Sequence, residues 1–251
     1  MNELIQTKTD SILTLTLNRP EKRNALNDGL IHSLISALEE ARKDTDLRAI
    51  VIKGAGKDFC SGADLEALRK ISDSDILENL EDAEVLLELF SLMRKVSIPI
   101  IAAVNGRALA GGCGLATACD IVLAAEGAEF GYPEVRIGFV PAMVMAILRR
   151  NLSEKRSFEL ITQGFRFSAK EALEMGLINR VFPEADFETN VLEYASVYKT
   201  VSRSAVVLSK KLLYQMDGKD FDSALSIGAE INAIARLTED CRNGISRFLD
   251  R

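Results

Sequence analysis

The chain has 251 residues, one histidine, no tryptophan, four cysteines and a formal net charge of −6. This length fits one large domain, or one domain with a helical appendage, because single cores stop growing near roughly 250 residues. A single histidine excludes a multi-histidine metal site and argues against a Ser-His-Asp hydrolase. The acidic balance argues against charge-driven binding to nucleic acid or to anionic membranes. Carboxylates, thiols and backbone groups remain to carry any chemistry.

The cysteines and the amino-terminal residues exclude further classes of protein. No Cys-x-x-Cys pair is present, so we expect inert buried thiols rather than a zinc site. A nucleophilic Cys113 would need a base, and His32 lies far away in sequence, beside the apolar stripe of a predicted helix. The first ten residues lack the basic and apolar segments of a signal peptide, and the most apolar stretch, 98–104, is too short to cross a bilayer. We therefore expect a cytoplasmic protein.

The amino-terminal half alternates predicted strands and helices. Residues 12–17 alternate with the period of two that is typical of a strand, and we expect them to pair with residues 3–8. Asn27 is placed to cap a helix whose apolar residues recur at helical spacing. This alternation favours an α/β core with parallel pairing. Further strands are predicted at 48–53, 98–104 and 120–125, and further helices at 78–95 and from Gly111.

After Pro141 the pattern becomes almost wholly helical. Ser153 and Ser168 are placed as N-caps, each with acidic residues close behind. We therefore expect an α/β core over residues 1–190 and a helical part over 191–251. The last helices are predicted at 186–200, 204–215, 220–236 and 238–249.

Two turns place backbone N–H groups where an anion could bind. We expect Ala63 and Gly111 to lie at helix N-termini, where free N–H groups and the helix dipole favour negative charge. Two such donors that converge from separate loops would form an oxyanion hole able to polarise a thioester carbonyl. The alternative is that the neighbouring glycines only permit tight packing of helix against strand.

Four segments carry a family resemblance in their order and spacing. They are Asn18-Arg19-Pro20 with the basic residues after it, Phe59 to Asp64, Asn105 to Gly114, and Phe130 to Gly138 before Pro141. Together they resemble the crotonase family, also called the enoyl-CoA hydratase/isomerase superfamily, over nearly the whole chain. The resemblance implies a crotonase-like α/β spiral of repeated β-β-α units and carboxy-terminal helices that support homotrimers or homohexamers.

The resemblance also implies an acyl-CoA site. Ala63 and Gly111 match the two N–H donors that hold the thioester oxygen, and Phe248 matches a position where a neighbouring subunit closes the pocket. Lys22 and Arg23 match basic residues near the CoA phosphates, although a solvated turn would explain them equally well. The family uses no metal, and its only cofactor-like group is the CoA thioester of the substrate. The remaining residues expected to contact substrate or CoA are Ala25, Ser61, Gly62, Asp64, Leu65, Gly112, Gly114, Pro133 and Arg136.

One carboxylate of the family's usual pair is missing. Two-base hydratases carry a Glu three residues after the oxyanion-hole glycine and a second Glu twenty residues later. Here the first position is Gly114 and the second is Glu134. A single carboxylate can shift a proton between carbons, or take one from water and return it to the α-carbon. The sequence therefore predicts an enoyl-CoA hydratase with Glu134 as acid and base, and a Δ3,Δ2-enoyl-CoA isomerase remains the alternative.

The expected substrate and the non-enzymatic alternative rest on weaker features. The residues around Glu134 resemble the methylglutaconyl-CoA hydratase branch, which acts in leucine degradation on β-branched, carboxylate-bearing acyl groups. Arg136 could meet such a carboxylate, or could serve as a structural ion-pair partner. The lost glutamate also leaves open a non-catalytic oligomer that binds CoA or RNA. The candidate RNA face consists of Arg149, Arg150, Lys155 and Arg156.

Overall fold

The fold is built on one large and one small β-sheet. The computed structural model describes residues 2–250, and the side chain of Leu65 lies outside the described part. The large sheet has the order β1-β2-β3-β4-β6-β9, with β1 antiparallel to β2 and the later pairs parallel. Its strands are β1 (Leu4–Thr9), β2 (Ile12–Leu17), β3 (Ala49–Gly54), β4 (Ile100–Val104), β6 (Ile121–Ala125) and β9 (Arg180–Phe182). The small sheet has the order β5-β7-β8, with β5 (Arg107–Leu109), β7 (Glu129–Gly131) and β8 (Arg166–Ser168).

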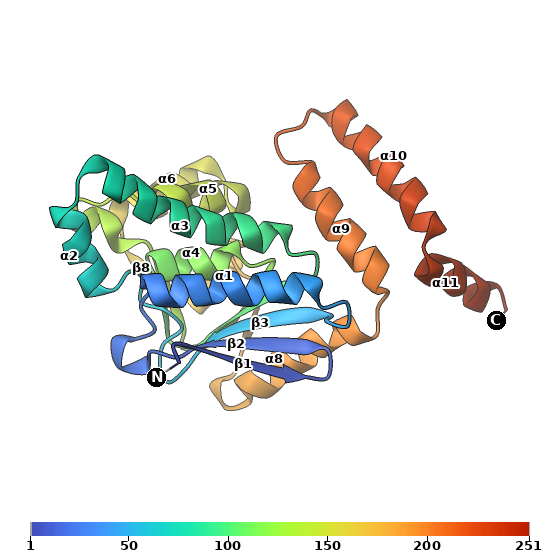
Figure 1. The fold of residues 1–251 in the computed structure, drawn as a ribbon, viewed down its shortest axis with the longest axis horizontal. Coiled ribbons are helices and arrows are strands. Elements are labelled where there is room, and N and C mark those ends of the chain that lie inside the picture. Colours follow the sequence, from blue (N-terminus) through green and yellow to red (C-terminus); the bar gives the residue numbers. More distant parts are fainter. Residues whose placement is uncertain (1, 251) are drawn as a thin grey trace.

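The central strands of the large sheet, β3, β4 and β6, are buried on both faces, because successive side chains of a strand point to opposite sides. In β3, Ile50 and Ile52 face the main core, whereas Ala49 and Val51 face a second cluster. Figure 1 shows the helices α1 (Asp28–Lys43), α3 (Ile76–Lys95) and α4 (Gly111–Ala118) over one face and α8 (Phe187–Ser196) over the other. This double burial explains why β3, β4 and β6 are almost continuously apolar.

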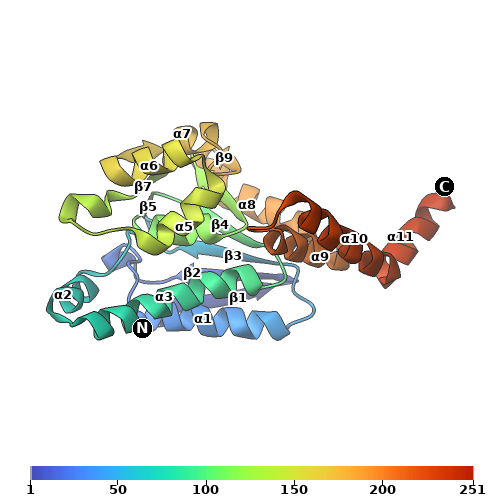
Figure 2. The same ribbon diagram turned by 90° about the horizontal axis from the view of Figure 1, so that it is seen from above.

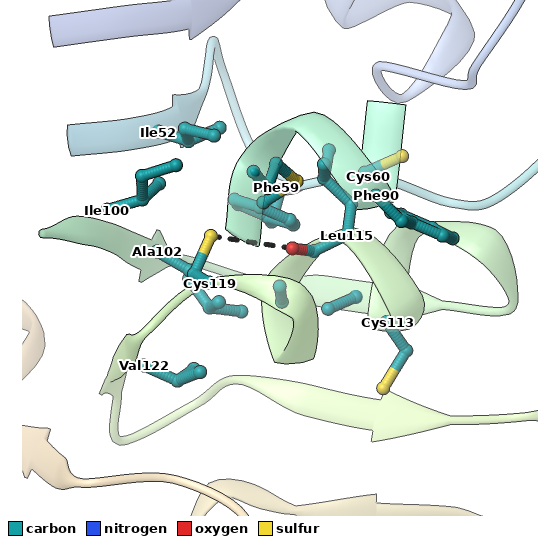
Figure 3. Close-up of a cluster of buried hydrophobic side chains, with 14 of the residues drawn as sticks. Ile52, Phe59, Cys60, Phe90, Ile100, Ala102, Cys113, Leu115, Cys119 and Val122 are labelled. Atoms are coloured by element: carbon teal, nitrogen blue, oxygen red, sulfur yellow. Dashed lines mark hydrogen bonds between the residues drawn. The ribbon is translucent and has the colours of Figure 1, made fainter. Parts of the chain in front are cut away.

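Helix α4 lies within the main core. Six of its eight residues are buried. Figure 3 shows Leu115 and Cys119 among side chains of β3, β4 and β6, with the Cys119 thiol donating a hydrogen bond to the Leu115 carbonyl oxygen at 3.4 Å. Because α4 is enclosed in this way, its N-terminus is held at a fixed place relative to both sheets.

Repeated β-β-α units are visible in the chain order. Strand β4 of the large sheet is followed by β5 of the small sheet and then by α4. Strand β6 is followed in the same way by β7, by the 3₁₀ helix η2 (Pro133–Ile137) and by α5 (Ala142–Asn151). Strand β3 leads to an isolated bridge between Cys60 and Ala108, which takes the place of a second strand, and then to α2 (Leu65–Asp73) and α3. The implied β-β-α pattern is therefore present.

The expected helix caps are confirmed. The Asn27 side chain accepts from the Leu30 N–H, and Ser153 and Ser168 cap their helices in the same way. The remaining helices are α6 (Glu154–Gln163), α7 (Ala169–Glu174), α9 (Arg203–Gln215), α10 (Phe221–Leu237) and α11 (Glu239–Leu249), with the 3₁₀ helices η1 (Pro20–Lys22), η3 (Glu184–Asp186) and η4 (Val197–Lys199).

The last three helices extend away from the sheets. Figures 1 and 2 show α9, α10 and α11 projecting from one end of the molecule, opposite α2 and the start of α3. Helix α9 is fastened to the core by Lys210, whose ammonium lies 2.6 Å from an Asp120 carboxylate oxygen and also donates to the Met93 and Ile98 carbonyls. The Tyr214 hydroxyl donates to the other Asp120 oxygen at 2.5 Å. The predicted boundary near residue 190 falls inside α8, whose Val191 and Ala195 still pack on the sheet.

Some predicted elements are wrong in extent. The segment after Pro141 is not almost wholly helical, because it contains β8 and β9, which are too short to show a period in sequence. Helix α3 begins at Ile76, two residues before the predicted start, because Asp75 and Glu78 form a capping box. The predicted helix 186–200 is interrupted, since α8 ends at Ser196 and η4 follows. Within residues 2–250, no helix combines the length and apolar character needed to cross a membrane.

Candidate active site

Two backbone N–H groups converge beside the small sheet. The Leu109 N–H donates to the Cys60 carbonyl, and the Cys60 N–H donates to the Arg107 carbonyl, so the segment after Cys60 runs beside β5. A Cβ atom built on Gly62 would lie 3.6 Å from the Gly111 nitrogen. In the part of the chain that the structure describes, neither the Ala63 N–H nor the Gly111 N–H has a hydrogen-bond acceptor. The two donors are therefore near each other and free to bind an external oxygen.

The approach of these two segments depends on glycine. Gly62 has φ +99°, and a Cβ there would lie 2.8 Å from the Ala110 Cβ. A Cβ on Gly112 would lie 2.3 Å from the Cys60 carbonyl oxygen. The glycines thus permit close packing, as the alternative interpretation proposed, and the same packing brings the donors together.

Ala110 is held in a strained backbone conformation. It is the N-cap of α4, with φ 51° and ψ −129°, a region that residues with a Cβ rarely adopt. Its own N–H donates to the Gly131 carbonyl of β7. Such strain costs about 1–3 kcal/mol and persists only where the surroundings impose it. Here it turns the chain so that the Gly111 N–H opens α4 without an internal partner.

Ala63 does not lie at a helix N-terminus, contrary to the prediction. Helix α2 begins at Leu65, and Asp64 is its N-cap, accepting from the Glu66 N–H. Ala63 instead forms a parallel bridge with Leu26. Its N–H is left free because the bridge uses the N–H groups of Leu26 and Asp64. The error arose because Asp64 is itself a strong cap, which moves the helix start downstream.

Asp64 has a structural partner. Its carboxylate lies 2.6 Å from the Arg19 guanidinium, and both side chains are largely buried. Burial alone would raise the pKa of Asp64, but the hydrogen bonds from the Glu66 N–H and from Arg19 outweigh it and hold the pKa below its usual value. The Arg19 guanidinium also donates to the Ala25 carbonyl. Arg19 thus ties the segment that carries Asp64 to the turn that carries Ala25.

The turn that carries Lys22 and Arg23 is exposed and lies beside the segment that carries the Ala63 N–H group. Lys22 and Arg23 are both exposed, and Arg23 has a positive φ of 54°. The buried Asn24 side chain secures this turn by donating to the Ala55 and Asp58 carbonyls. The Ser61 N–H donates to the Arg23 carbonyl, so the turn lies directly against the segment that carries Ala63. Asn24 lies in the segment singled out from sequence with Lys22 and Arg23, but its anchoring role could not be predicted, because it depends on carbonyl groups more than thirty residues away.

Glu134 is a buried carboxyl group with an unpartnered oxygen. It lies in η2 and is 8 % exposed, and among residues 2–250 its Oε2 has no hydrogen-bond partner. Burial raises the pKa of Glu134 above its ordinary value. A buried carboxyl without a partner costs stability and is a common sign of a functional group. Pro133 opens η2 and fixes the turn from which Glu134 projects.

Apolar side chains occupy the space beside Gly114. A Cβ on Gly114 would lie 2.6 Å from Val144 Cγ2 and 3.5 Å from Phe90 Cζ. Val144 and Phe90 are 4 % and 7 % exposed. Among the described residues, the side-chain atoms nearest to the position of the missing glutamate are therefore apolar. Val144 was not found from sequence, because nothing in α5 signals its contact with α4.

The structure does not bring the other residues singled out from sequence together in one site. Arg136 is exposed, and its Nε donates to the Gly164 carbonyl at 2.8 Å rather than to a carboxylate. Phe248 is 76 % exposed on α11, in the helices that project away from the sheets. His32 is exposed, with its ring nitrogen Nδ1 2.7 Å from the Asp28 carbonyl. Burial raises the pKa of the Cys113 thiol to about 12, so it is not a nucleophile near neutral pH.

Comparisons with known proteins identify the family of this chain. The family described as enoyl-CoA hydratase/isomerase matches residues 7–251. The chain belongs to this family. It is 35 % identical over 252 residues to the 2,3-dehydroadipyl-CoA hydratase of Escherichia coli, covering 100 % of this chain and 97 % of that protein. It is 30 % identical over 253 residues to the short-chain-enoyl-CoA hydratase of Clostridium acetobutylicum, covering 100 % and 96 %.

Solved structures confirm the expected fold. An enoyl-CoA hydratase of Mycobacterium smegmatis superposes with a TM-score of 0.95 at 29 % identity, covering 99 % of this chain and 96 % of that one. The protein thus has the α/β crotonase fold with carboxy-terminal helices, and it is an enzyme of the enoyl-CoA hydratase, or hydro-lyase, family acting on acyl-CoA. Among the described residues, no group of three or more His, Cys, Asp or Glu side chains is placed to hold a metal ion.

Proposed function

We propose that the protein hydrates an α,β-unsaturated acyl-CoA, with Glu134 as acid and base and the Ala63 and Gly111 N–H groups as the oxyanion hole. The observation that carries this proposal is the pair of unpartnered donors that converge where the Gly62 turn meets α4. The buried carboxyl of Glu134 supplies a titratable group from the next unit of the fold. These are the elements needed to stabilise an enolate and to move its proton.

The chemistry follows from these groups. The thioester oxygen accepts hydrogen bonds from both N–H groups, which draws electrons from the double bond and makes the β-carbon electrophilic. Ionised Glu134 takes a proton from water as the water oxygen bonds to the β-carbon. The resulting enolate collapses and receives that proton at the α-carbon. A raised pKa makes Glu134 both a better base and a usable acid near neutral pH.

CoA would lie along the exposed turn. In this proposal Lys22 and Arg23 meet its phosphates, and the backbone of Ser61, Gly62 and Leu65 lies against its adenine. The direct contact between the Ser61 N–H and the Arg23 carbonyl supports one continuous surface for both parts. Asp64 contributes through Arg19, as a group that holds the loop in shape.

The alternative activity is Δ3,Δ2-enoyl-CoA isomerisation by the same residues. The apolar wall of Val144 and Phe90 beside Gly114 favours it, because a second group to orient water is missing at this point. The experiment that separates the two uses crotonyl-CoA, 3-methylglutaconyl-CoA and a 3-enoyl-CoA in ¹⁸O-labelled water. Hydration incorporates the label, whereas double-bond migration without label would refute the hydratase proposal.

The acyl group and the assembly are part of the proposal. A carboxylate-bearing acyl chain, of the glutaconyl type or of the dehydroadipyl type named for the Escherichia coli relative, is the class we propose. Exposed apolar side chains on α10 and α11 support self-association as a trimer or hexamer in which Phe248 reaches a neighbouring site. The cytoplasmic location, the role in leucine or fatty acid metabolism and the 1–190/191–251 division stay predictions.

The RNA-binding alternative has little structural support. Three of the four cations of its candidate face have acidic partners: Arg149 with Glu154, Arg150 with Asp217, and Arg156 with Glu159. Each pair removes positive charge that a phosphate backbone would need. Loss of hydration in Glu134→Gln with CoA binding retained would favour the enzyme over a silent CoA-binding oligomer.

A further inference from the structure

A cavity lies at the far end of α4 from the oxyanion donors. It has a volume of about 480 Å³, is open to solvent on one side, and is bordered by α3, α5 and α9 over the carboxy-terminal end of α4. This volume falls within the range of sites that hold small ligands, roughly 300–1,000 Å³. Its apolar wall includes Leu87, Phe90, Met143, Ile147 and Leu213.

The cavity lies on the same face of α4 as the free Gly111 N–H and Gly114. Gly111, Gly114 and Ala118 occupy one face of α4, because residues three, four and seven apart lie above one another on a helix. Ala118 lines the cavity, about 10 Å beyond Gly111 at the helical rise per residue. Phe90 joins the two regions, since its ring lies against Gly114 and also lines the cavity. A chain longer than a crotonyl group would reach the cavity when Phe90 turns aside.

The cavity also carries excess positive charge. Arg94 and Arg150 line it, and both guanidinium groups pair with the same carboxylate oxygen of Asp217. Burial would raise the pKa of Asp217, but hydrogen bonds from Arg150 and Arg94 lower it further than burial raises it, so Asp217 stays ionised. Asp120 also lines the cavity and is paired with Lys210, so two carboxylates face three cations and one positive charge is left. The Arg94 guanidinium is held 4.2 Å from the centre of the Tyr214 ring, which keeps it in place.

We propose that this cavity holds the distal part of the acyl chain and that Arg94 and Arg150 bind a carboxylate at its end. The inference rests on the proposed function and narrows its substrate class to medium-chain enoyl-CoA thioesters with a terminal carboxylate. Apolar walls suit the methylene groups, and a planar guanidinium suits a carboxylate through paired hydrogen bonds. The arginine side chains are one-third to one-half exposed, so their pairing with Asp217 is weak enough to be rearranged.

The test compares ligands of equal length that differ only at the chain end. Suberyl-CoA and octanoyl-CoA are saturated, so calorimetry measures their dissociation constants without turnover. The corresponding 2-enoyl thioesters then give kcat/KM with and without the terminal carboxylate. We expect the carboxylated member to be favoured by about tenfold to hundredfold, the strength of a charge-assisted hydrogen bond. Arg150→Met should remove most of this preference.

Two further variants make the test specific. Arg149 neighbours Arg150 on α5 but pairs with Glu154 outside the cavity, so Arg149→Met should keep the preference. Phe90→Ala should raise kcat/KM for both eight-carbon substrates relative to crotonyl-CoA. Equal affinity for suberyl-CoA and octanoyl-CoA, or a preference untouched by Arg150→Met, would overturn the proposal. A change of oligomeric state in Arg150→Met without a change of preference would also overturn it, by showing that a second copy covers the cavity.

Failure of the proposed function is separate from these outcomes. It would appear as absence of turnover with every enoyl-CoA, while the calorimetric comparison of the saturated ligands would still decide what the cavity binds.

Discussion

Replacing Ala110 by glycine is expected to stabilise the fold and weaken the enzyme. Ala110 has φ 51° and ψ −129°, a conformation that costs a residue with a Cβ about 1–3 kcal/mol. Glycine adopts this conformation without strain, but it makes the unfolded chain more flexible, and this offsets about 0.4–1 kcal/mol of the gain in stability. The net expectation is a gain of about 1 kcal/mol in the free energy of unfolding. For a chain of this size, that gain corresponds to a rise in Tm of about 2–4 °C.

Activity should move in the opposite direction. The Ala110 methyl group lies against Gly62 and holds the turn that presents the Gly111 N–H. A more mobile donor is aligned with the thioester oxygen for less of the time. Because small displacements of reacting groups cost up to about a hundredfold, we expect kcat/KM for crotonyl-CoA to fall by about tenfold to hundredfold.

The assay pairs urea unfolding with the loss of enoyl absorbance. Ala233→Gly is the matched control, because Ala233 is exposed in the middle of α10 and a glycine there should cost about 1 kcal/mol. If Ala110→Gly proved no more stable than the wild type, the strain argument would be wrong. Undiminished kcat/KM in a stabilised variant would show that the strain does not position the donor.

Three further predictions concern the carboxyl group, the apolar wall and the anchor of α9. Glu134→Gln should lower kcat by about 10²- to 10⁴-fold, and in the wild type kcat/KM should rise with pH through a pKa above the ordinary glutamate value, because the ionised form is the base. Gly114→Ala should destabilise by about 1–3 kcal/mol, because its Cβ would lie 2.6 Å from Val144 Cγ2; urea unfolding measures this. Lys210→Met should destabilise by about 3–5 kcal/mol, because it leaves the Asp120 carboxylate without its ammonium partner; thermal unfolding measures this.

Each of these predictions has a contradicting result. If kcat/KM of Glu134→Gln still rose with pH over the same range, the titrating group would not be Glu134. The free energy of unfolding should also depend on pH. Because the pKa of Glu134 is raised in the folded state, its contribution to stability is fully present below the ordinary glutamate pKa and is lost as the pH rises through the raised pKa. In Glu134→Gln that pH dependence should disappear. Unchanged stability of Gly114→Ala, or of Lys210→Met, would mean that Val144 moves easily or that Asp120 finds another partner.

The sequence revealed the features that depend on neighbouring residues. Asn27 capped its helix as predicted, and the glycines around Gly111 marked the turn into α4. Glu134 was found through the family resemblance, because it lies twenty residues after Gly114, where the family carries its second glutamate. Strands β5 and β7 were missed because three residues are too few to show a period of two.

Features that depend on distant contacts could not be predicted. An alanine gives no sign of a positive φ, so the strain at Ala110 was invisible until the β7 contact was known. The wall beside Gly114 joins α4 to Val144 on another helix, and the cavity joins Arg94 to Arg150 through Asp217 in the turn after α9. Packing between elements, rather than local preference, decides such contacts.

The proposed oxyanion donors belong to the main chain, and this bears on how the enzyme can evolve. Substitution of Ala63 or Gly111 by any residue except proline leaves the backbone N–H group in place. Point mutations can therefore alter the acid–base residue or the acyl pocket while activation of the thioester survives. Proteins that share this turn could therefore change from one reaction to another without passing through an inactive ancestor. The absence of a carboxylate at Gly114 is a change of the kind that such proteins would tolerate.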